Sequence, residues 1–308
     1  MTNTLTNDLT PLKLATVIGA NGFIGRHLLA RLQRDGWQCQ VSPRQGGWLL
    51  QRPLGTVFYC AGLTADYAQR PHDTVLAHVG LLNDILATAQ FDSLVYLSST
   101  RLYDSLPCVL AGVATDEDGA LALNPAQPRH LYDLSKALGE SLCRQASRGR
   151  ARVARLACVY AGGAQAEGFL PQLLRQVSDS AVDGDGVLRI DTSAQLMRDY
   201  VHIDDVVEAL VLIATRGTQA VYNVASGANT TNAQLFDRLG QLSGRDIRFM
   251  RSQRAPNAAQ SAAQGAAPVA IDRLRNEFGW QPVPVLDKLA ELVQHNPALA
   301  PQATACCA

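Results

Sequence analysis

The sequence predicts an α/β fold in which a doubly wound parallel sheet is followed by a smaller C-terminal lobe. The first observation is that short apolar runs rich in β-formers alternate, over the first half of the chain, with longer segments of helical periodicity. The second is that this regularity decays after Tyr160, where glycine and proline interrupt the pattern. Because parallel strands are joined by right-handed crossovers, the alternation predicts helices on both faces of one sheet.

Each element follows from a local signal. Strands are expected where short apolar runs are bounded by turn-forming or charged residues, at 12–18, 37–42, 56–60, 93–98 and 152–159. Helices are expected where apolar residues recur every three or four positions, at 23–34, 73–89, 131–147 and 285–295. The larger unit is expected at 12–160 and roughly 198–224, the lobe at roughly 161–197 and 225–296, a surface loop at 252–268 and a disordered tail at 297–308.

Composition excludes several classes of protein. Lys+Arg 27 balance Asp+Glu 27, which argues against binding nucleic acid by phosphate neutralisation. No apolar run approaches the roughly 20 residues that span a bilayer, and the first ten residues lack the features of a signal peptide, so we expect a cytoplasmic protein with no membrane partner. The seven cysteines form no Cys-x-x-Cys pair and the six histidines show no ligand spacing with them, so neither disulfides nor a metal site is expected.

A glycine-rich turn, Gly19-Ala-Asn-Gly22-Phe-Ile-Gly25, lies between the first expected strand and helix. The first glycine permits a tight turn, the second lets the backbone approach a pyrophosphate, and the third permits close packing of helix on strand. Amides at the start of the helix then face the anion. The turn therefore predicts a Rossmann-like dinucleotide site. Its residues are Gly19, Asn21, Gly22, Phe23, Ile24 and Gly25.

The end of the second expected strand indicates which dinucleotide binds. An acidic residue that would hold a ribose 2′-hydroxyl is expected there, and the sequence has none. It offers instead the hydroxyl of Ser42 and the guanidinium of Arg44, groups that suit a 2′-phosphate. NADP is therefore the preferred cofactor, with NAD as the alternative if Arg44 is only a solvated loop cation.

Tyr132 and Lys136 lie four residues apart on an expected helix, so their side chains share one face. A phenol has a pKa near 10, and a nearby cation favours its phenolate, which indicates a general base assisted by Lys136. Ser99 directly follows the fourth expected strand, at the sheet edge where ligands of such folds bind. Its hydroxyl could hydrogen-bond the substrate oxygen that exchanges a proton with Tyr132.

These motifs, together with the segments 198–205 (Arg-Asp-Tyr-Val-His-Ile-Asp-Asp) and 222–227 (Tyr-Asn-Val-Ala-Ser-Gly), occur in the order found in extended short-chain dehydrogenases/reductases. The chain resembles the nucleotide-sugar epimerase/dehydratase type of that family from about residue 12 to 292. The resemblance implies that Ser99, Tyr132 and Lys136 are catalytic, and that Arg198 meets a substrate diphosphate. It also implies a homodimer built through the helices expected at 73–89 and 131–147.

Two further sets of residues complete the expected site. Tyr132 and Lys136 also contact the cofactor, and the remaining cofactor-binding residues are Cys60, Ala61 and Gly62. The substrate-binding residues are Thr64, Ser99, Thr100, Cys158 and Arg198.

The chain also departs from the family pattern. The link between Arg44 and residue 56 is too short for the usual third strand, and His78 replaces an asparagine common in the family. Cys158 likewise stands where many members carry an asparagine. Nucleotide-sugar dehydratases carry an Asp-Glu pair where this chain has Thr100 and Arg101, so the sequence does not favour 4,6-dehydration.

Three functions remain from the sequence. The first is an NAD(P)-dependent nucleotide-sugar epimerase that removes and returns a hydride, with Tyr132 as general base and acid. The second is an NADPH-dependent ketoreductase or dehydrogenase acting on a sugar nucleotide or another small carbonyl compound. The third is a non-catalytic dinucleotide sensor, because a protein can keep this fold without catalysing a reaction.

Overall fold

The computed structural model describes residues 13–42, 51–106, 115–162, 168–179, 187–250 and 267–294. In this part of the chain, six parallel strands form one sheet in the order β2-β1-β3-β4-β5-β9. Their bounds are Leu14–Ile18 (β1), Gln38–Val41 (β2), Thr56–Tyr59 (β3), Ser93–Ser99 (β4), Ala151–Leu156 (β5) and Val221–Val224 (β9). The sheet confirms the expected fold class. Among the described residues β2 is an edge strand, in line with the short link that follows it.

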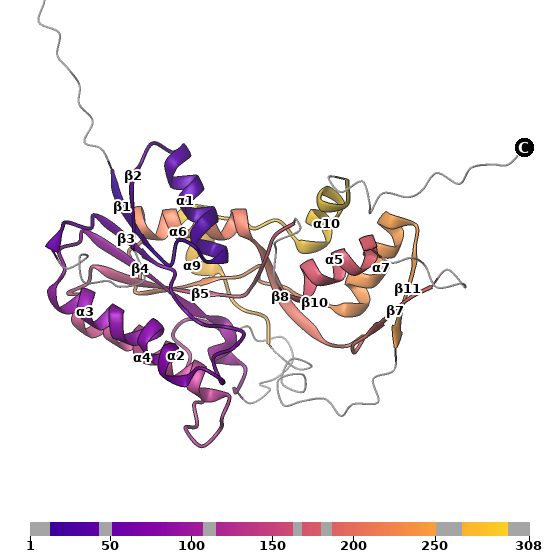
Figure 1. Cartoon of the computed structure of the whole chain (residues 1–308). Helices are drawn as coiled ribbons and strands as arrows, with labels where there is room; N and C mark the ends of the chain where they lie inside the picture. The colour runs from indigo at the N-terminus through magenta and orange to yellow at the C-terminus, as the bar shows by residue number, and fades with distance from the viewer. Residues whose placement is uncertain are drawn as a thin grey trace, which may run out of the picture.

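Helices cover both faces of this sheet (Figure 1). On one face lie α1 (Phe23–Arg34) and α6 (Ile203–Arg216), and on the other lie α2 (Pro71–Val75), a π-helical segment η2 (Leu76–Gly80), α3 (Leu81–Thr88) and α4 (His130–Ala146). A short 3-10 helix, η3 (Thr100–Tyr103), follows β4. None of the helices in these ranges is long and apolar enough to cross a membrane.

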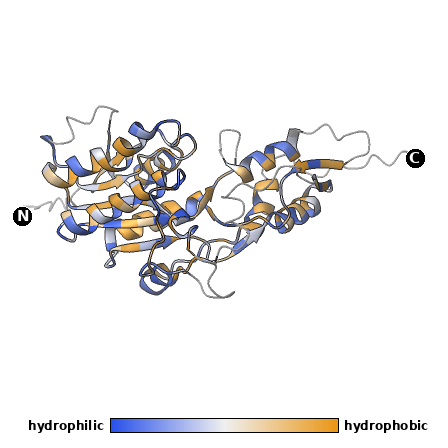
Figure 2. Ribbon diagram, turned by 90° about the horizontal axis from the view of Figure 1, so that it is seen from below, coloured by the Kyte–Doolittle hydropathy of each residue, from blue (hydrophilic) through white to orange (hydrophobic). Residues whose placement is uncertain are grey.

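The smaller lobe is more regular than the sequence indicates. One sheet has the order β10-β8-β6, and β11 pairs with β7 in a second. The strands are Cys158–Tyr160 (β6), Val187–Asp191 (β7), Met197–His202 (β8), Asn229–Thr231 (β10) and Asp246–Met250 (β11). The helices are Phe169–Asp179 (α5), Asn232–Ser243 (α7) and Val285–Gln294 (α10), and they share an apolar core that includes Leu173, Phe236 and Leu289. Seen from below, the two bodies are joined by extended segments (Figure 2).

Two expected elements are interrupted. The single strand expected at 152–159 is two strands separated by Ala157, because β5 pairs with β4 and β9 whereas β6 pairs with β8 in the lobe. The single helix expected at 73–89 contains the π-helical segment η2 between α2 and α3. The tail at 297–308 and residues 252–266 of the expected loop lie outside the described residues.

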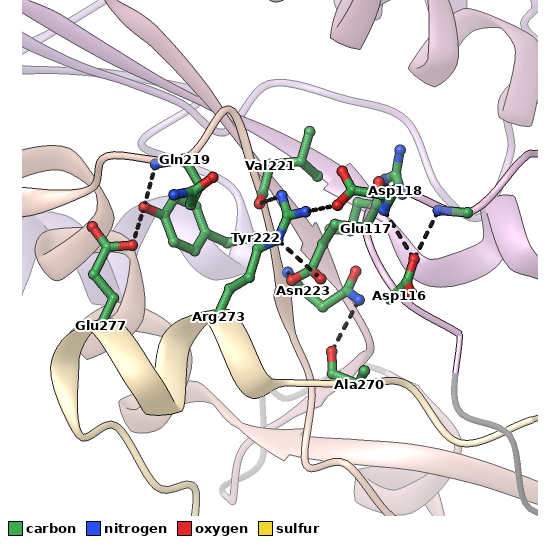
Figure 3. Close-up of polar contacts among 12 residues, drawn as sticks. Asp116, Glu117, Asp118, Gln219, Val221, Tyr222, Asn223, Ala270, Arg273 and Glu277 are labelled. Atoms are coloured by element: carbon green, nitrogen blue, oxygen red, sulfur yellow. Dashed lines mark hydrogen bonds and ion pairs between the residues drawn. The ribbon is translucent and has the colours of Figure 1, made fainter.

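Buried polar contacts tie the segment after residue 267 to the main sheet (Figure 3). The Glu117 carboxylate accepts a hydrogen bond from the Asn223 backbone N–H (2.9 Å) and lies 3.4 Å from the Arg273 guanidinium. Arg273 also donates to the Val221 carbonyl (3.1 Å), and the Asn223 amide donates to the Ala270 carbonyl (3.0 Å). Helix α9 (Asp272–Phe278), which carries Arg273, therefore packs on β9 rather than within the smaller lobe.

Candidate active site

The glycine turn between β1 and α1 is sterically closed to larger residues. Gly19 has φ +81°, and its carbonyl accepts a hydrogen bond from the Gly22 N–H (3.0 Å). A Cβ on Gly25 would lie 2.2 Å from the Gly19 oxygen, so only glycine lets the helix approach the strand this closely. Asn21 and Gly22 are exposed, and in the described chain no side chain caps α1 and no acidic residue lies in its first turn. The helix N-terminus therefore suits the diphosphate of a dinucleotide.

The turn after β3 lies against this glycine turn. A Cβ on Gly19 would lie 2.7 Å from the Ala61 nitrogen, and one on Gly62 would lie 3.2 Å from the Lys136 Nζ. Burial raises the pKa of the Cys60 thiol to about 12, so Cys60 is a neutral packing residue. The residues expected to contact the cofactor in this turn are thus adjacent both to the glycines and to Lys136.

Ser99, Tyr132 and Lys136 converge at the carboxyl end of β4. Ser99 is the last residue of β4 and hydrogen-bonds the Tyr132 phenol, which projects from α4 and is 4% exposed. Lys136, one turn further along α4, is buried and donates from Nζ to the Leu97 carbonyl (2.9 Å). Burial raises the pKa of Tyr132, and the charge of Arg101 and the hydrogen bond from Ser99 act against that rise.

Within the described residues, no carboxylate forms an ion pair with Lys136. Its burial lowers its pKa to about 7, and the nearby Glu140 carboxylate only partly opposes this effect. Its Nζ lies 6.0 Å from the centre of the Tyr132 ring. Lys136 therefore contributes a charge to the site that changes near neutral pH.

His78 is fully buried beside Tyr132, with the two ring centres 5.2 Å apart. Its Nε2 accepts from the Leu63 N–H (3.2 Å), so Nδ1 carries the proton and donates to the Ser135 hydroxyl (2.7 Å). Ser135 in turn donates to the Tyr132 carbonyl (2.8 Å). Burial and the charge of Lys136 lower the pKa of His78 to about 3, so the ring is neutral. His78 thus links the turn after β3 to the first turn of α4.

From the sequence alone, Arg101 is recognised only as a residue that replaces an acid of the dehydratases. The structure shows that Arg101 also contacts Tyr132. The guanidinium carbon lies 4.4 Å from the centre of the Tyr132 ring and 5.2 Å from that of Tyr67. Its position two residues after Ser99, at the ligand-binding edge of the sheet, is a signal that could have revealed it.

The expected substrate residues lie on both sides of this cluster. Arg198, on β8, hydrogen-bonds the Cys158 thiol on β6 and acts electrostatically on Asp104. Asp104 also lies 3.8 Å from Arg129. A cavity of about 460 Å³ adjoins these groups. It is lined by Asp104, Ser105, Ala122, Leu123, Asn124, Gln127, Arg129 and His130.

The remaining predicted residues are less informative. The Thr100 hydroxyl donates to the Leu156 carbonyl (3.3 Å), so it holds η3 to β5. Thr64 is exposed shortly after Gly62. Ser42 follows β2, and its N–H donates to the Val17 carbonyl (3.3 Å). Arg44 lies outside the described residues.

A sequence-family model matches residues 48–225, which is more than half of the chain. The family is described as "NAD dependent epimerase/dehydratase family". The chain belongs to this family. The match confirms the resemblance drawn from the motifs, and the chain is an NAD(P)-dependent enzyme of the extended short-chain dehydrogenase/reductase type. No curated protein matches the chain.

Solved structures of epimerases and dehydratases share its fold. RMD from Pseudomonas aeruginosa, complexed with NADPH, is 22% identical, with a TM-score of 0.67 over 92% of this chain and 97% of the other. A UDP-glucose 4-epimerase from Thermotoga maritima, with UDP-glucose, is 20% identical, with a TM-score of 0.70 over 91% and 97%. An NDP-hexosamine 5,6-dehydratase of tunicamycin biosynthesis is 18% identical, with a TM-score of 0.68 over 93% and 99%.

Proposed function

We propose that this enzyme is a nucleotide-sugar epimerase in which Tyr132 is the general base and acid. The main support is the convergence of Ser99, Tyr132 and Lys136 beside the glycine turn. In the oxidative half-reaction the Tyr132 phenolate takes the proton of a sugar hydroxyl, while Ser99 donates a hydrogen bond to the same oxygen. In the return half-reaction Tyr132 gives that proton back. Bound NAD(P) supplies a nicotinamide that takes up and returns a hydride.

Arg101 supports epimerisation over dehydration. Loss of water needs an acid for the leaving hydroxyl, and the position that carries the glutamate of the dehydratases holds a guanidinium here. An arginine remains protonated at any physiological pH and cannot take that role. Arg198, beside Cys158, is proposed to bind the substrate diphosphate.

We propose NADP as the preferred cofactor. The residues of β2 and Ser42 include no carboxylate for a 2′-hydroxyl, and a serine hydroxyl is a group that suits a 2′-phosphate. The same observation favours the second candidate, an NADPH-dependent ketoreductase, which would use the same three residues and release its oxidised cofactor in each cycle.

Replacing Tyr132 with phenylalanine tests the mechanism. Turnover of a panel of nucleotide sugars and keto-sugars should fall by about 10²–10⁴-fold, the usual contribution of a general base. Tyr160→Phe is a matched control, because within the described chain the buried Tyr160 hydroxyl has no hydrogen-bond partner. Full activity in Tyr132→Phe would refute the proposed base.

The small molecules released on denaturing the purified protein separate the two candidates. NADP or NAD retained in about equimolar amount supports an epimerase that recycles its cofactor, and mass spectrometry identifies which dinucleotide it is. A protein that carries none, and that reduces keto-sugars with NADPH, supports the reductase.

A further inference from the structure

The guanidinium of Arg101 covers one face of the Tyr132 ring at 4.4 Å. The backbone places it there, because the Arg101 N–H donates to the Ser99 hydroxyl oxygen (3.2 Å) at the start of η3. The Tyr67 ring also faces this guanidinium, with its centre 5.2 Å from the guanidinium carbon and 5.4 Å from the centre of the Tyr132 ring. The Ser99 hydroxyl thus contacts both the Tyr132 phenol and the backbone N–H of Arg101, whose guanidinium covers the Tyr132 ring.

Arg101 lies closer than Lys136 to the centre of the Tyr132 ring. Lys136 lies 6.0 Å from the ring centre, and its Nζ is engaged by the Leu97 carbonyl. An arginine keeps its charge at every physiological pH, whereas buried Lys136 loses its own near neutrality.

Two carboxylates, Asp133 and Asp104, act on the charge of Arg101, and within the described residues neither makes an ion pair with it shorter than 3.9 Å. Its Nε lies 3.9 Å from Asp133, a carboxylate that lies closer to Arg129, at 3.3 Å. The Arg101 side chain is 34% exposed, which leaves part of its field open to the ring and to the site. The other titratable groups that face Tyr132 are Tyr67, Tyr96 and the neutral His78.

We propose that Arg101 is a positioning residue that supplies the permanent positive charge favouring the Tyr132 phenolate. A cation held over an aromatic ring stabilises negative charge that is delocalised into that ring. The charge that assists the base would then come from η3 as well as from Lys136 on α4. The effect on turnover rests on the proposed function, whereas the effect on the phenol does not.

A tyrosinate absorbance titration tests the inference without a substrate. The signal of Tyr132 is the difference between each protein and the same protein carrying Tyr132→Phe. In Arg101→Gln the midpoint should rise by about 1 pH unit, the scale of one close charge, and in Arg101→Lys it should rise less. An unchanged midpoint in a folded Arg101→Gln would overturn the proposal.

The pH profile of kcat/KM is the second arm. In the direction in which Tyr132 acts as base, the acid limb of this profile should shift upward in Arg101→Gln and shift less in Arg101→Lys. A higher KM with an unshifted profile would overturn the inference and make Arg101 a substrate-binding residue instead. If wild-type protein turned over no sugar nucleotide or carbonyl compound, the proposed function would fail, while the absorbance titration would still decide the role of Arg101.

Discussion

Lys136 carries its charge at a cost to the folded state. The pKa of this lysine is lowered from 10.5 to about 7 by burial, so between these values the unfolded chain binds more protons than the folded chain. The free energy of unfolding therefore rises with pH across this window. Below pH 7 both states hold the proton and the penalty is fully present.

Lys136→Met should consequently stabilise the protein while it lowers activity. We expect a gain of about 2 kcal/mol at pH 7, after allowing for the lost hydrogen bond to the Leu97 carbonyl. The gain should shrink as the pH approaches 10. Urea unfolding at several pH values measures it, with exposed Lys13→Met as the control. A destabilised Lys136→Met at pH 7 would contradict the expectation.

At the residue scale, the sequence was sufficient to bring the main candidates together. Spacing and position at strand ends predicted that Ser99, Tyr132 and Lys136 meet, and their side chains do meet, although their roles remain predictions. The position of Arg101 after Ser99 could have placed it near the site, but its stacking on the Tyr132 ring depends on the first turn of η3. The tautomer of His78 depends on Leu63, fifteen residues away.

At the scale of elements, the π-helical segment η2 has a specific cause. The Tyr59 hydroxyl donates to the Ala77 carbonyl (2.8 Å), and the Tyr96 hydroxyl donates to the His78 carbonyl (3.1 Å). Both tyrosines lie on strands of the central sheet. Both hydroxyls donate to backbone carbonyls within the π-helical turn. A π-bulge of this kind often lies at a functional site.

Tyr96→Phe should therefore lower the free energy of unfolding by about 1–2 kcal/mol, because it leaves the His78 carbonyl buried with one donor fewer. Equilibrium unfolding in urea measures the change. Tyr160→Phe, which removes a buried hydroxyl that lacks a partner in the described chain, should have a much smaller effect. Equal stabilities of the two variants would rule out this account of η2.

Long elements were predictable, including α10 of the lobe, whereas the strands and the other helices of the lobe were not. The bounds of α1 agree with the 23–34 expected from periodicity. Pro171 was read as an interruption, yet it lies in the first turn of α5, where its missing N–H has no helical partner to lose. A capping box, Thr231 with Gln234, begins α7 and was an overlooked signal. The break at Ala157 depends on which sheet each half joins.

At the scale of the whole molecule, exposed apolar side chains lie on two neighbouring helical segments of the larger unit. Leu76 on η2 is 63% exposed and Leu138 on α4 is 50% exposed, and these two helical segments contact each other. We propose that this face forms the homodimer interface. Leu138→Glu should convert a dimer into a monomer in sedimentation analysis.

The control for this prediction is Val283→Glu, which changes another exposed apolar residue (40%) on the segment before α10 and should leave the dimer intact. A wild-type protein that sediments as a monomer at micromolar concentration would refute the interface.

The contacts of Glu117 have a consequence for how the chain is made. Its partner Asn223 lies 106 positions later, and Arg273 follows after a further fifty. Until Asn223 and Arg273 have left the ribosome, the Glu117 carboxylate of the nascent protein lacks the Arg273 guanidinium. Over the same period the six-stranded sheet lacks β9. Native contacts between such distant segments form slowly because their loops must close first. The early strands must therefore wait for the C-terminal third of the polypeptide before the sheet is complete.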